Sequence, residues 1–496
     1  MPPLMPAPDQ AILGRRAEIA AALQAIVPGE GVITAADELA AYESDGLAAY
    51  RQLPMLVVLP STVDQVARIL RYCHDQGIKV VPRGGGTSLS GGSLPLADGI
   101  VLAMGKFNRI LAIDYDNRCV VAQPGVTNLG ITNAVQHAGF YYAPDPSSQI
   151  ACSIGGNVAE NAGGVHCLKY GLTANNVLGI EMVLVTGEVV RLGGKHLDSE
   201  GYDLLGVMTG SEGLLGVITE VTVRILRKPA TARALLLGFP SNEQAGDCVG
   251  AVIAEGIIPG GMEMMDRPAI HAVEDFVHAN YPLDVESLLI VELDGPAAEV
   301  EELIARVEAI ARRCGASYLK ASGSEPERLR FWAGRKAAFP AVGRITPDYL
   351  CMDGTIPRAR LPEVLSRMAA LSRQCGLRIA NVFHAGDGNL HPLILFDANA
   401  GELERAEKLG ADILRLCVEV GGVLTGEHGV GVEKRDLMPT MFTEIDLDQQ
   451  MRVKCAFDPN GLLNPGKMFP TLHRCAELGR LHVRGGRLPH PDIPRF

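Results

Sequence analysis

The chain has 496 residues, of which 47% are hydrophobic and 21% charged, and its formal net charge is −12. This composition is typical of a water-soluble globular protein with two or three domains. The negative net charge argues against nucleic acid as the main partner. No apolar stretch approaches the roughly 18–20 residues that a membrane-spanning helix needs, and residues 1–16 lack the pattern of a secretory signal. We therefore expect a cytoplasmic protein that binds no nucleic acid.

The 11 cysteines are scattered along the chain, and none of them forms a CxxC pair. The sequence therefore predicts neither a zinc ribbon nor an iron–sulfur cluster. The odd number of cysteines favours reduced thiols in the cytoplasm. If the protein transfers electrons, it carries no ferredoxin-type relay of its own.

The first part of the chain is expected to be a helical cap followed by a domain rich in strands. Residues 9–27 have the apolar spacing of an amphipathic helix, within a cap that spans 1–50. From Met55 short apolar runs alternate with helical patterns, and this organisation ends near Lys228, so 51–228 is assigned to one domain. The predicted strands are 55–60, 77–82, 99–104, 109–115 and 119–126, and the predicted helices are 61–77 and 127–137.

A glycine-rich stretch at residues 80–92, VVPRGGGTSLSGG, is the most informative feature of this domain. Glycine permits positive φ angles and close approach of another group, so consecutive amide groups can form a concave cradle for an anion such as a pyrophosphate. A flexible linker is the alternative interpretation of a Gly/Ser run. Two further glycine-rich segments, 144–164 and 209–226, favour the cradle, because three loops around one large phosphorylated or planar ligand would explain why they occur together.

After Lys228 longer helical patterns alternate with single strands, which predicts an α+β domain over 229–470 that resembles the ferredoxin-like fold. The helix at 297–314 is clearly amphipathic, since Val300, Ile304 and Val307 fall on one face. The other predicted helices are 241–255 and 267–279, and the predicted strands are 233–239, 256–265, 287–295 and 316–322.

Two histidines flank the hairpin pattern at residues 378–396, RIANVFHAGDGNLHPLILF. If His384 pairs with His391, Val382 pairs with Leu393, and the two imidazoles share one face with Cβ atoms roughly 5 Å apart. That spacing suits two ligands of one metal ion. A pair of histidines hydrogen-bonded across a hairpin is the structural alternative.

Glu427 and His428 stand between Gly426 and Gly429 in the segment GGVLTGEHGVGVEKRD. Two histidines with one glutamate form a known divalent-metal set that leaves positions open for substrate, and it accepts zinc, manganese or iron. The sequence therefore predicts His384, His391 and Glu427 as metal ligands and leaves His428 free to act as a base. A solvated turn is the alternative.

Cationic residues surround the single tryptophan, Trp332, in RLRFWAGRKAAF. An arginine here could bind a carboxylate bidentately, although a charge run on a helix is more often a solvated face. The candidates are Arg328, Arg330, Arg335 and Lys336.

The strings PRGGGTSLSGG, PDPSSQ, IGGNVAENAGG and GSEGLLGVIT resemble the FAD-binding domain of the vanillyl-alcohol-oxidase-type flavoproteins. The resemblance implies that the first loop holds the FAD pyrophosphate. Some relatives attach flavin through a histidine in that loop, where this chain has Thr87 and Ser88, so non-covalent FAD is implied and His166 is a less favoured attachment point. The residues implied in FAD binding are Arg83, Gly84, Gly85, Gly86, Thr87, Ser88, Pro144, Ser148, Gly155, Gly156, Asn157, Asn161, Gly163, Gly164, Glu212, Gly213, Gly216, Val217, Ile218 and Asn464.

The segments RFWAGRKAAFP, DYLCMDGTIPR, NVFHAGDGNLHPLILFD, GGVLTGEHGVGVEK and DPNGLLNPGKMFP resemble the FAD-linked D-2-hydroxyacid dehydrogenases, a family that includes the FAD subunits of bacterial glycolate oxidases. The resemblance implies metal binding by His384, His391 and Glu427, base catalysis by His428 and substrate-carboxylate binding by Arg335. Relatives that oxidise dicarboxylates have a lysine for the second carboxylate in the segment that corresponds to CMDGTIP. This sequence offers Met352 there. A small monocarboxylate such as glycolate or D-lactate is therefore expected.

The resemblance also implies how electrons leave the flavin. In the relatives, partner subunits with a second flavin-type domain and iron–sulfur clusters pass electrons to the membrane quinone pool, which predicts peripheral membrane association at the inner face. The tail 471–496 is rich in arginine and is a candidate dock for such a partner. A stand-alone D-lactate dehydrogenase and a non-catalytic flavin electron-transfer subunit remain as alternatives.

Overall fold

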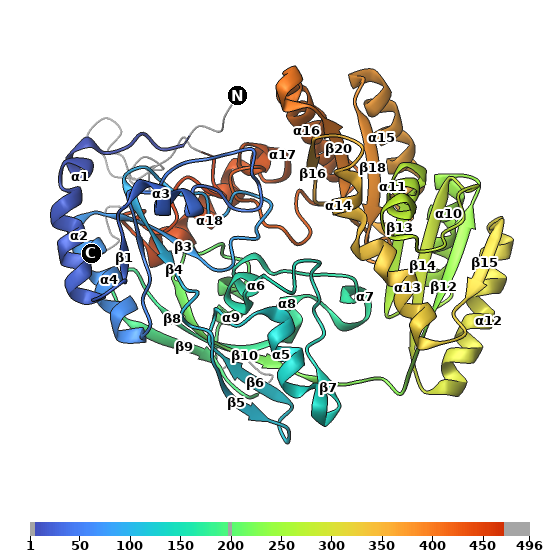
Figure 1. Ribbon diagram of the computed structural model, residues 1–496, viewed down its shortest axis with the longest axis horizontal. Helices are drawn as coiled ribbons and strands as arrows, with labels where there is room; N and C mark the ends of the chain where they lie inside the picture. The colour runs from blue at the N-terminus through green and yellow to red at the C-terminus, as the bar shows by residue number, and fades with distance from the viewer. Residues whose placement is uncertain (1–4, 197–200, 471–496) are drawn as a thin grey trace.

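The computed structural model describes residues 5–196 and 201–470. It has two lobes, one built on a four-stranded and a five-stranded sheet and the other on a seven-stranded sheet (Figure 1). No helix of the described residues is long and apolar enough to cross a membrane.

The four-stranded sheet carries the first glycine-rich loop at the end of a parallel strand. Its order is β1 (Val32–Ile33), β2 (Leu56–Val58), β4 (Gly99–Ala103), β3 (Lys79–Arg83), with β2, β4 and β3 parallel. Helix α4 (Val63–Gln76) begins at the Thr62 cap and ends at Gly77, whose φ is 68°. The predicted N-terminal helix is two helices, α1 (Gln10–Gly14) and α2 (Arg16–Ile26), and α2 packs Ile19 and Leu23 into the core of this sheet.

The five-stranded sheet is antiparallel and lies beside the cavity described below. Its order is β5 (Ile110–Asp114), β6 (Cys119–Ala122), β10 (Val217–Arg224), β8 (Val177–Val183), β9 (Val189–Gly193). Helix α5 (Asn128–Val135) packs against it. The second glycine-rich segment contains a helix, α6 (Ile154–Glu160), because Ser153 caps its start and Asn161, with a φ of 56°, ends it.

The seven-stranded sheet is antiparallel, and the α+β prediction for this region is confirmed. Its order is β15 (Tyr318–Ala321), β12 (Thr231–Phe239), β14 (Ser287–Gly295), β13 (Gly261–Asp266), β18 (Arg378–Phe383), β20 (Pro392–Phe396), β16 (Asp348–Cys351). The first four strands have the chain order 4-1-3-2 of a ferredoxin-like unit, and the last three extend it. Strand β13 starts five residues later than predicted, because Pro259 and Gly260 interrupt the strand pattern.

Helices cover both faces of this sheet. Alternate residues of β12 enter different cores, with Leu235 and Leu237 on one face and Ala234 and Leu236 on the other, which explains its continuous apolar run. One face packs against α10 (Asn242–Ala254), α12 (Ala297–Arg313), α15 (Leu361–Cys375) and α16 (Leu403–Glu419), and the other against α11 (Arg267–Val277), α13 (Glu325–Lys336) and α14 (Ala338–Val342).

The predicted register of the histidine hairpin is wrong. Asn381 pairs with Pro392 and Ala380 with Leu393, and His384 forms a bridge with Asn389 rather than with His391. The shift is by two residues, and because side chains alternate with a period of two, both histidines stay on one face. His391 lies opposite Val382, diagonal to His384, and the two imidazole centroids are 4.9 Å apart.

The end of the described chain returns to the first lobe. Helix α18 (Glu444–Phe457) lies beside the four-stranded sheet in Figure 1. The Val80 N–H donates to the Leu462 carbonyl, and the Asn464 N–H donates to the Val80 carbonyl, both at 2.8 Å. Residues 444–468 therefore help to hold the first glycine-rich loop, and the predicted dock at 471–496 lies outside the described residues.

The remaining elements are short. They are α3 (Ala36–Leu39), β7 (Phe140–Tyr141), α7 (Cys167–Tyr170), α8 (Thr173–Asn176), α9 (Leu204–Met208), β11 (Leu226–Arg227), β17 (Gly354–Thr355), β19 (Asn389–Leu390), α17 (Met438–Met441) and the 3₁₀ turns at Ala40–Tyr42, Gln136–Ala138, Arg358–Arg360, Ala398–Ala400 and Arg435–Leu437. Nine described cysteines are free thiols, whereas Cys455 is disulfide-bonded and departs from the expectation of reduced thiols.

Candidate active site

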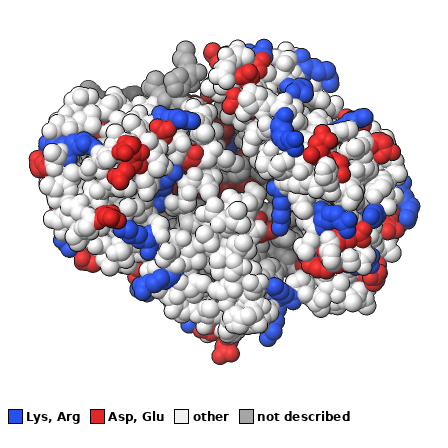
Figure 2. Space-filling model, in the orientation of Figure 1, with Lys and Arg blue, Asp and Glu red and all other residues white. Residues whose placement is uncertain are grey.

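A cavity of about 400 Å³ lies where the glycine-rich loops meet the segment that contains Glu427 and His428. Its volume is within the roughly 300–1,000 Å³ range of ligand pockets. The space-filling view shows a hollow between the two lobes, on a face where acidic and basic side chains are interspersed (Figure 2). Most of the residues predicted to bind FAD line this cavity: Arg83, Gly84, Gly85, Gly86, Thr87, Ser88, Ser148, Gly155, Gly156, Asn157, Glu212, Gly213, Gly216, Val217 and Ile218.

Five of the residues predicted to bind FAD do not line the cavity: Pro144, Asn161, Gly163, Gly164 and Asn464. Two of them hold the loops that do. The Asn464 amide donates to the carbonyls of Gly92 and Glu212 at 2.8 and 2.7 Å. Asn161 ends α6 and accepts a hydrogen bond from the Ala174 N–H.

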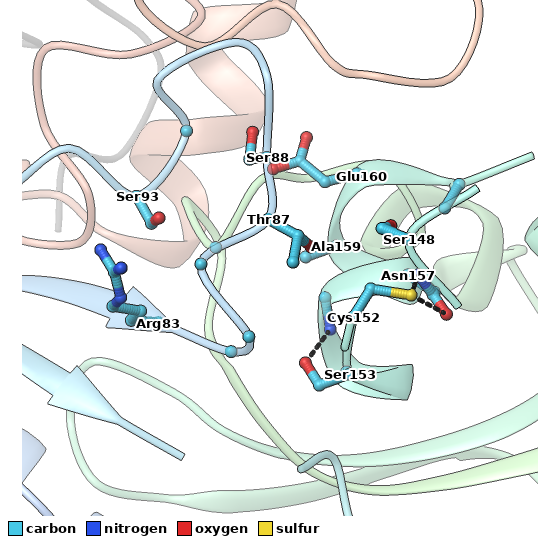
Figure 3. A pocket seen from close by; sticks show the side chains of 18 of the residues that line it. Arg83, Thr87, Ser88, Ser93, Ser148, Cys152, Ser153, Asn157, Ala159 and Glu160 are labelled. Atoms are coloured by element: carbon cyan, nitrogen blue, oxygen red, sulfur yellow. Dashed lines mark hydrogen bonds between the residues drawn. The ribbon is translucent and has the colours of Figure 1, made fainter. Parts of the chain in front are cut away.

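The first loop presents both backbone and side chains to the cavity. Gly84 and Gly85 are solvent-accessible, so their peptide groups can be approached closely, and Gly86 adopts a φ of 67° that favours glycine. The Arg83 side chain is held by a hydrogen bond from its Nη1 to the Ser44 carbonyl at 2.7 Å. Figure 3 shows Arg83 and Thr87 on one side of the cavity and Ser148, Ser153 and Asn157 on the other. The accessible glycine backbone of this wall is what an anion cradle needs, and the binding of a pyrophosphate there stays a prediction.

Glu160 is a cavity residue that the sequence analysis did not select. It lies beside Ser88 in Figure 3, and its Oε2 is buried without a hydrogen-bond partner. Burial raises the pKa of Glu160 well above its ordinary value, and the nearby Glu212 carboxyl adds to the rise. The neutral acid is therefore favoured, and it does not oppose an anionic ligand in the same cavity.

The three predicted metal ligands converge at one end of the cavity, where Glu427 lines the wall and His384 and His391 lie buried behind it. Glu427 Oε1 lies 3.0 Å from His391 Nε2 and 3.4 Å from His384 Nε2, and one ligand atom from each residue lies within 4.8 Å of the others. His428 Nε2 is 3.7 Å from the same oxygen, and its ring is stacked on that of His391 at 5.0 Å. Two imidazoles, a carboxylate and an adjacent third imidazole are therefore in place, although the register that led to them was wrong.

The charges in this cluster are strongly coupled. Burial raises the pKa of Glu427, but His384 and His391 outweigh it and hold that pKa well below its ordinary value, so Glu427 is a carboxylate. Burial lowers the pKa of His428 to about 4, so its imidazole is neutral at pH 7 and able to accept a proton.

Glu263 stands behind the cluster and was missed by the sequence analysis. Its Oε1 accepts from His384 Nδ1 at 2.8 Å, and its Oε2 accepts from Arg335 Nε at 2.8 Å. Arg335 is 3% exposed and does not line the cavity, whereas the next residue, Lys336, does. The structure therefore brings Arg335 to the cluster through Glu263, and its role as the carboxylate-binding residue stays a prediction.

The segment beside Cys351 differs from the expectation. Because side chains alternate along a strand, Cys351 and Met352 point in opposite directions. Cys351 Sγ lies within 4.8 Å of a ring nitrogen of both His391 and His428, whereas Met352 packs against Gly410 in the hydrophobic core. Cys351 rather than Met352 therefore lies beside the histidines, and the placement of Met352 at the substrate was wrong.

A second buried cluster joins the two lobes. His166 lies between Asp145, 2.9 Å from its Nδ1, and Glu292, 3.3 Å from its Nε2. Glu292 also accepts from Arg328 and from the Trp332 indole, so α13 is tied to the loop that precedes α7. Burial lowers the pKa of His166, but the two carboxylates outweigh it and hold the pKa well above its ordinary value. His166 is thus an interlobe ion-pair residue, and Arg328 is structural rather than a substrate ligand.

Comparison with known proteins identifies the family. Residues 54–193 match the FAD binding domain family, and residues 228–468 match the C-terminal domain of FAD linked oxidases. Glycolate oxidase subunit GlcD of Escherichia coli K12 is 58% identical over 97% of both chains. The chain belongs to the FAD-linked oxidases.

Other FAD-linked oxidases carry the resemblance across distant organisms. GlcD of Bacillus subtilis is 38% identical over 86% of this chain and 92% of its own, and a D-lactate dehydrogenase of Archaeoglobus fulgidus is 33% identical over 84% and 92%. Among solved structures, 4-ethylphenol oxidase from Gulosibacter chungangensis has a TM-score of 0.78 at 18% identity, covering 94% of this chain and 98% of its own. That likeness confirms the vanillyl-alcohol-oxidase-type fold.

The residues present fit the groups that this family implies. For FAD, the cavity offers accessible amides at its loops and apolar residues such as Val217 at its wall. For a divalent metal, His391 Nδ1 and Glu427 Oε2 are buried without hydrogen-bond partners, and the donor set is one that zinc, manganese and iron share.

Proposed function

We propose that the protein oxidises a short 2-hydroxy acid, with glycolate as the first candidate, to the 2-oxo acid. The observation that carries the proposal is the convergence of His384 and His391 on Glu427, which with His428 lines one end of the cavity formed by the predicted FAD residues. A dinucleotide at the loops would bring the substrate and the four side chains into one space.

Each residue of this end has a proposed role. A divalent ion held by His384, His391 and Glu427 would supply Lewis-acid polarisation of the substrate hydroxyl. His428 accepts the hydroxyl proton, a role that its neutral imidazole suits. Arg335 is proposed to bind the substrate carboxylate, because a guanidinium has five N–H donors and only its Nε is used by Glu263. When bound, FAD supplies the hydride acceptor, non-covalently.

The position of His428 is set by both of its backbone groups. Its N–H donates to Asp353 at 2.9 Å, and its carbonyl accepts from Ser90 Oγ at 2.9 Å. Asp353 belongs to the second lobe and Ser90 to the first glycine-rich loop. The base is therefore anchored to the FAD side and to the metal side at once, as proton transfer beside a flavin requires.

Glycolate is preferred over D-lactate because the relative with 58% identity is named a glycolate oxidase subunit. D-lactate is the second candidate, because a relative with 33% identity is a D-lactate dehydrogenase. Cys351 near the histidines offers no charge for a second carboxylate, which favours a monocarboxylate.

Partner subunits are proposed as the electron acceptors. The relatives from E. coli and B. subtilis are named as subunits, which supports a multi-subunit complex. We propose that partners with a second FAD domain and iron–sulfur clusters receive the electrons, and that they bring the chain to the inner face of the cell membrane through the arginine-rich residues 471–496.

The test is an anaerobic titration of the flavin-loaded protein with glycolate, D-lactate, L-lactate and D-2-hydroxyglutarate, with metal analysis of the same sample. Glycolate is expected to bleach the flavin absorbance at the lowest concentration. Bleaching by D-lactate alone would select the second candidate. A flavin that stays oxidised with every acid would overturn the proposal and favour an electron-transfer subunit.

A further inference from the structure

Glu263 is the only described residue recorded in hydrogen bonds to both a predicted metal ligand and the predicted carboxylate-binding arginine. Its two oxygens are divided between them, with Oε1 bonded to His384 Nδ1 and Oε2 bonded to Arg335 Nε, both at 2.8 Å. Glu263 lies on β13. His384 lies in the bridge after β18, 121 positions away in the sequence, and Arg335 lies on α13, 72 positions away.

The side chain of Glu263 is enclosed in the protein interior together with its two partners. Its side chain is fully buried, and those of Arg335 and His384 are 4% and 8% exposed. The neighbouring strand residues Met262 and Met264 enter a hydrophobic core. An ionised carboxylate in such a place is stable only when it is paired and hydrogen-bonded. Both partners hold the pKa of Glu263 below its ordinary value although burial opposes them.

The bond to His384 decides which nitrogen of that ring is available. Because Nδ1–H donates to Glu263, Nε2 is the ring nitrogen left to bind a metal ion, and it is Nε2 that faces Glu427 at 3.4 Å. A carboxylate behind a ligating histidine fixes the tautomer and ring orientation and raises ligand basicity. The bond to Arg335 fixes one edge of the guanidinium in the same way.

We propose that Glu263 is a positioning residue that sets both the metal affinity of His384 and the substrate-carboxylate affinity of Arg335. The inference rests on the proposed function, because it concerns the same metal and the same substrate. It goes further in stating that one carboxylate controls two binding events at the site, so that a single substitution weakens both.

The Glu263→Gln variant separates this role from simple packing. Glutamine has nearly the same shape, but it offers one acceptor oxygen where glutamate offers two. Its amide nitrogen must face either Arg335 Nε, a donor against a donor, or His384 Nδ1, which would move the ring proton to Nε2. Either arrangement disturbs the hydrogen bond to one of these two residues, and loss of the negative charge weakens the interaction with the other.

Glu292→Gln is the matched control. Glu292 is also buried, lies on the adjacent strand β14, and bonds Arg328 and Trp332 of the same helix as Arg335, but it contacts none of the predicted metal ligands. A general disturbance of α13 or of the sheet would affect both variants alike.

The experiment measures metal binding and carboxylate binding separately, in flavin-loaded protein. Metal affinity is measured by titrating Mn²⁺ and Zn²⁺ into chelator-treated protein without substrate. Carboxylate affinity is measured in metal-free protein by the change in flavin absorbance on addition of oxalate, a two-carbon acid that has no hydride to give. Glu263→Gln is expected to weaken metal binding about 10- to 100-fold and oxalate binding about tenfold, whereas Glu292→Gln leaves both within about twofold of wild type. Glu263→Asp, which keeps the charge but shortens the reach, is expected to follow Glu263→Gln.

The outcomes distinguish this inference from the proposed function. If wild type and His391→Ala retain the same metal, the proposed metal site fails. If wild type binds metal tightly and both Glu263 variants bind metal and oxalate as tightly as wild type, the positioning role alone fails. Equal losses in Glu292→Gln would also overturn it.

Discussion

Asp353 accepts a hydrogen bond from the backbone N–H of His428 at 2.9 Å, although the two residues are 75 positions apart. The same carboxylate accepts from the Gly426 N–H at 3.0 Å and the Glu427 N–H at 3.2 Å, and Lys434 Nζ donates to it at 3.2 Å. Burial raises the pKa of Asp353, but Lys434 and the nearby histidines outweigh it and hold the pKa below its ordinary value. One buried anion therefore fixes the backbone that carries both Glu427 and His428.

The Asp353→Asn variant is expected to lose stability and activity together. An asparagine turns an amide nitrogen toward groups that donate, and it removes the carboxylate closest to the fully buried Lys434 ammonium, which keeps only Glu433 at 3.5 Å as an acidic partner. Removal of one partner of a buried pair is strongly destabilising, by about 3–5 kcal/mol. Urea unfolding measures the effect, with Asp348→Asn, at the start of the preceding strand β16, as the control. Equal midpoints for the two variants would contradict this role.

His428→Ala is expected to lower kcat about 10²- to 10⁴-fold, the range for loss of a general base. The flavin should remain bound, because the cavity wall is otherwise unchanged. The exposed His137→Ala variant is the control. Turnover at the wild-type rate would show that His428 is not the base.

The pH profile of the wild type provides an independent check on His428. A base must be unprotonated, and burial lowers the pKa of this imidazole to about 4. For the free enzyme, kcat/KM is expected to stay level as the pH falls from 8 to 5 and to decrease only below about pH 4–5. A decrease centred near the ordinary histidine pKa of about 6.5 would contradict the buried, neutral base.

Metal removal should separate the chemistry from flavin binding. The His391→Ala and Glu427→Gln variants are expected to contain less than a tenth of the wild-type metal, because each removes one of three protein ligands, and to keep the flavin. Chelation of the wild type should abolish bleaching by glycolate, and added Mn²⁺ or Zn²⁺ should restore it. Unchanged bleaching after complete chelation would return the histidine pair to a structural role.

Much of the fold and the cluster followed from local patterns in the sequence. Residue type and spacing were enough to predict the glycine loops and the ferredoxin-like strands. They were also enough to select the residues of the cluster, which are His384, His391, Glu427 and His428. The hairpin register was wrong by two residues, since the cross-strand pairing depends on the turn at 385–388 as well as on apolar matching. Because the shift was by an even number of residues, both histidines stayed on the same face of the sheet, and the predicted cluster was unaffected.

The residues that the sequence could not select act through tertiary contacts. Glu263 is a charged residue between two methionines in the strand GMEMMD, and only the folded sheet and α13 give it two partners. Asp353 follows Met352 in a short segment with no helical or strand period. A charged residue inside an apolar strand was the available signal, and it identifies a buried polar group without naming its partner. Glu160 and Cys351 were missed for the same reason.

The alkaline pH dependence of stability is expected to depend on His166. Its folded pKa is raised by Asp145 and Glu292, so between about pH 6.5 and that higher value the folded protein holds a proton that the unfolded chain has lost. The stabilisation is therefore fully present below about pH 6.5 and is lost as the pH rises through the folded pKa. Glu292, whose pKa is lowered to about 2, stays ionised over the whole window and contributes no slope.

The His166→Gln variant tests this sign. Because the ring is 26% exposed and partly screened by water, the difference in unfolding free energy from wild type should be about 1–2 kcal/mol at pH 6. It should shrink steadily toward pH 9, where the wild-type ring has lost its proton. Thermal unfolding midpoints at pH 6, 7, 8 and 9 measure the trend, and the exposed His137→Gln variant corrects for the loss of any histidine. A difference that grows with pH, or that stays constant from pH 6 to pH 9, would show that the charge of His166 does not hold the two lobes together.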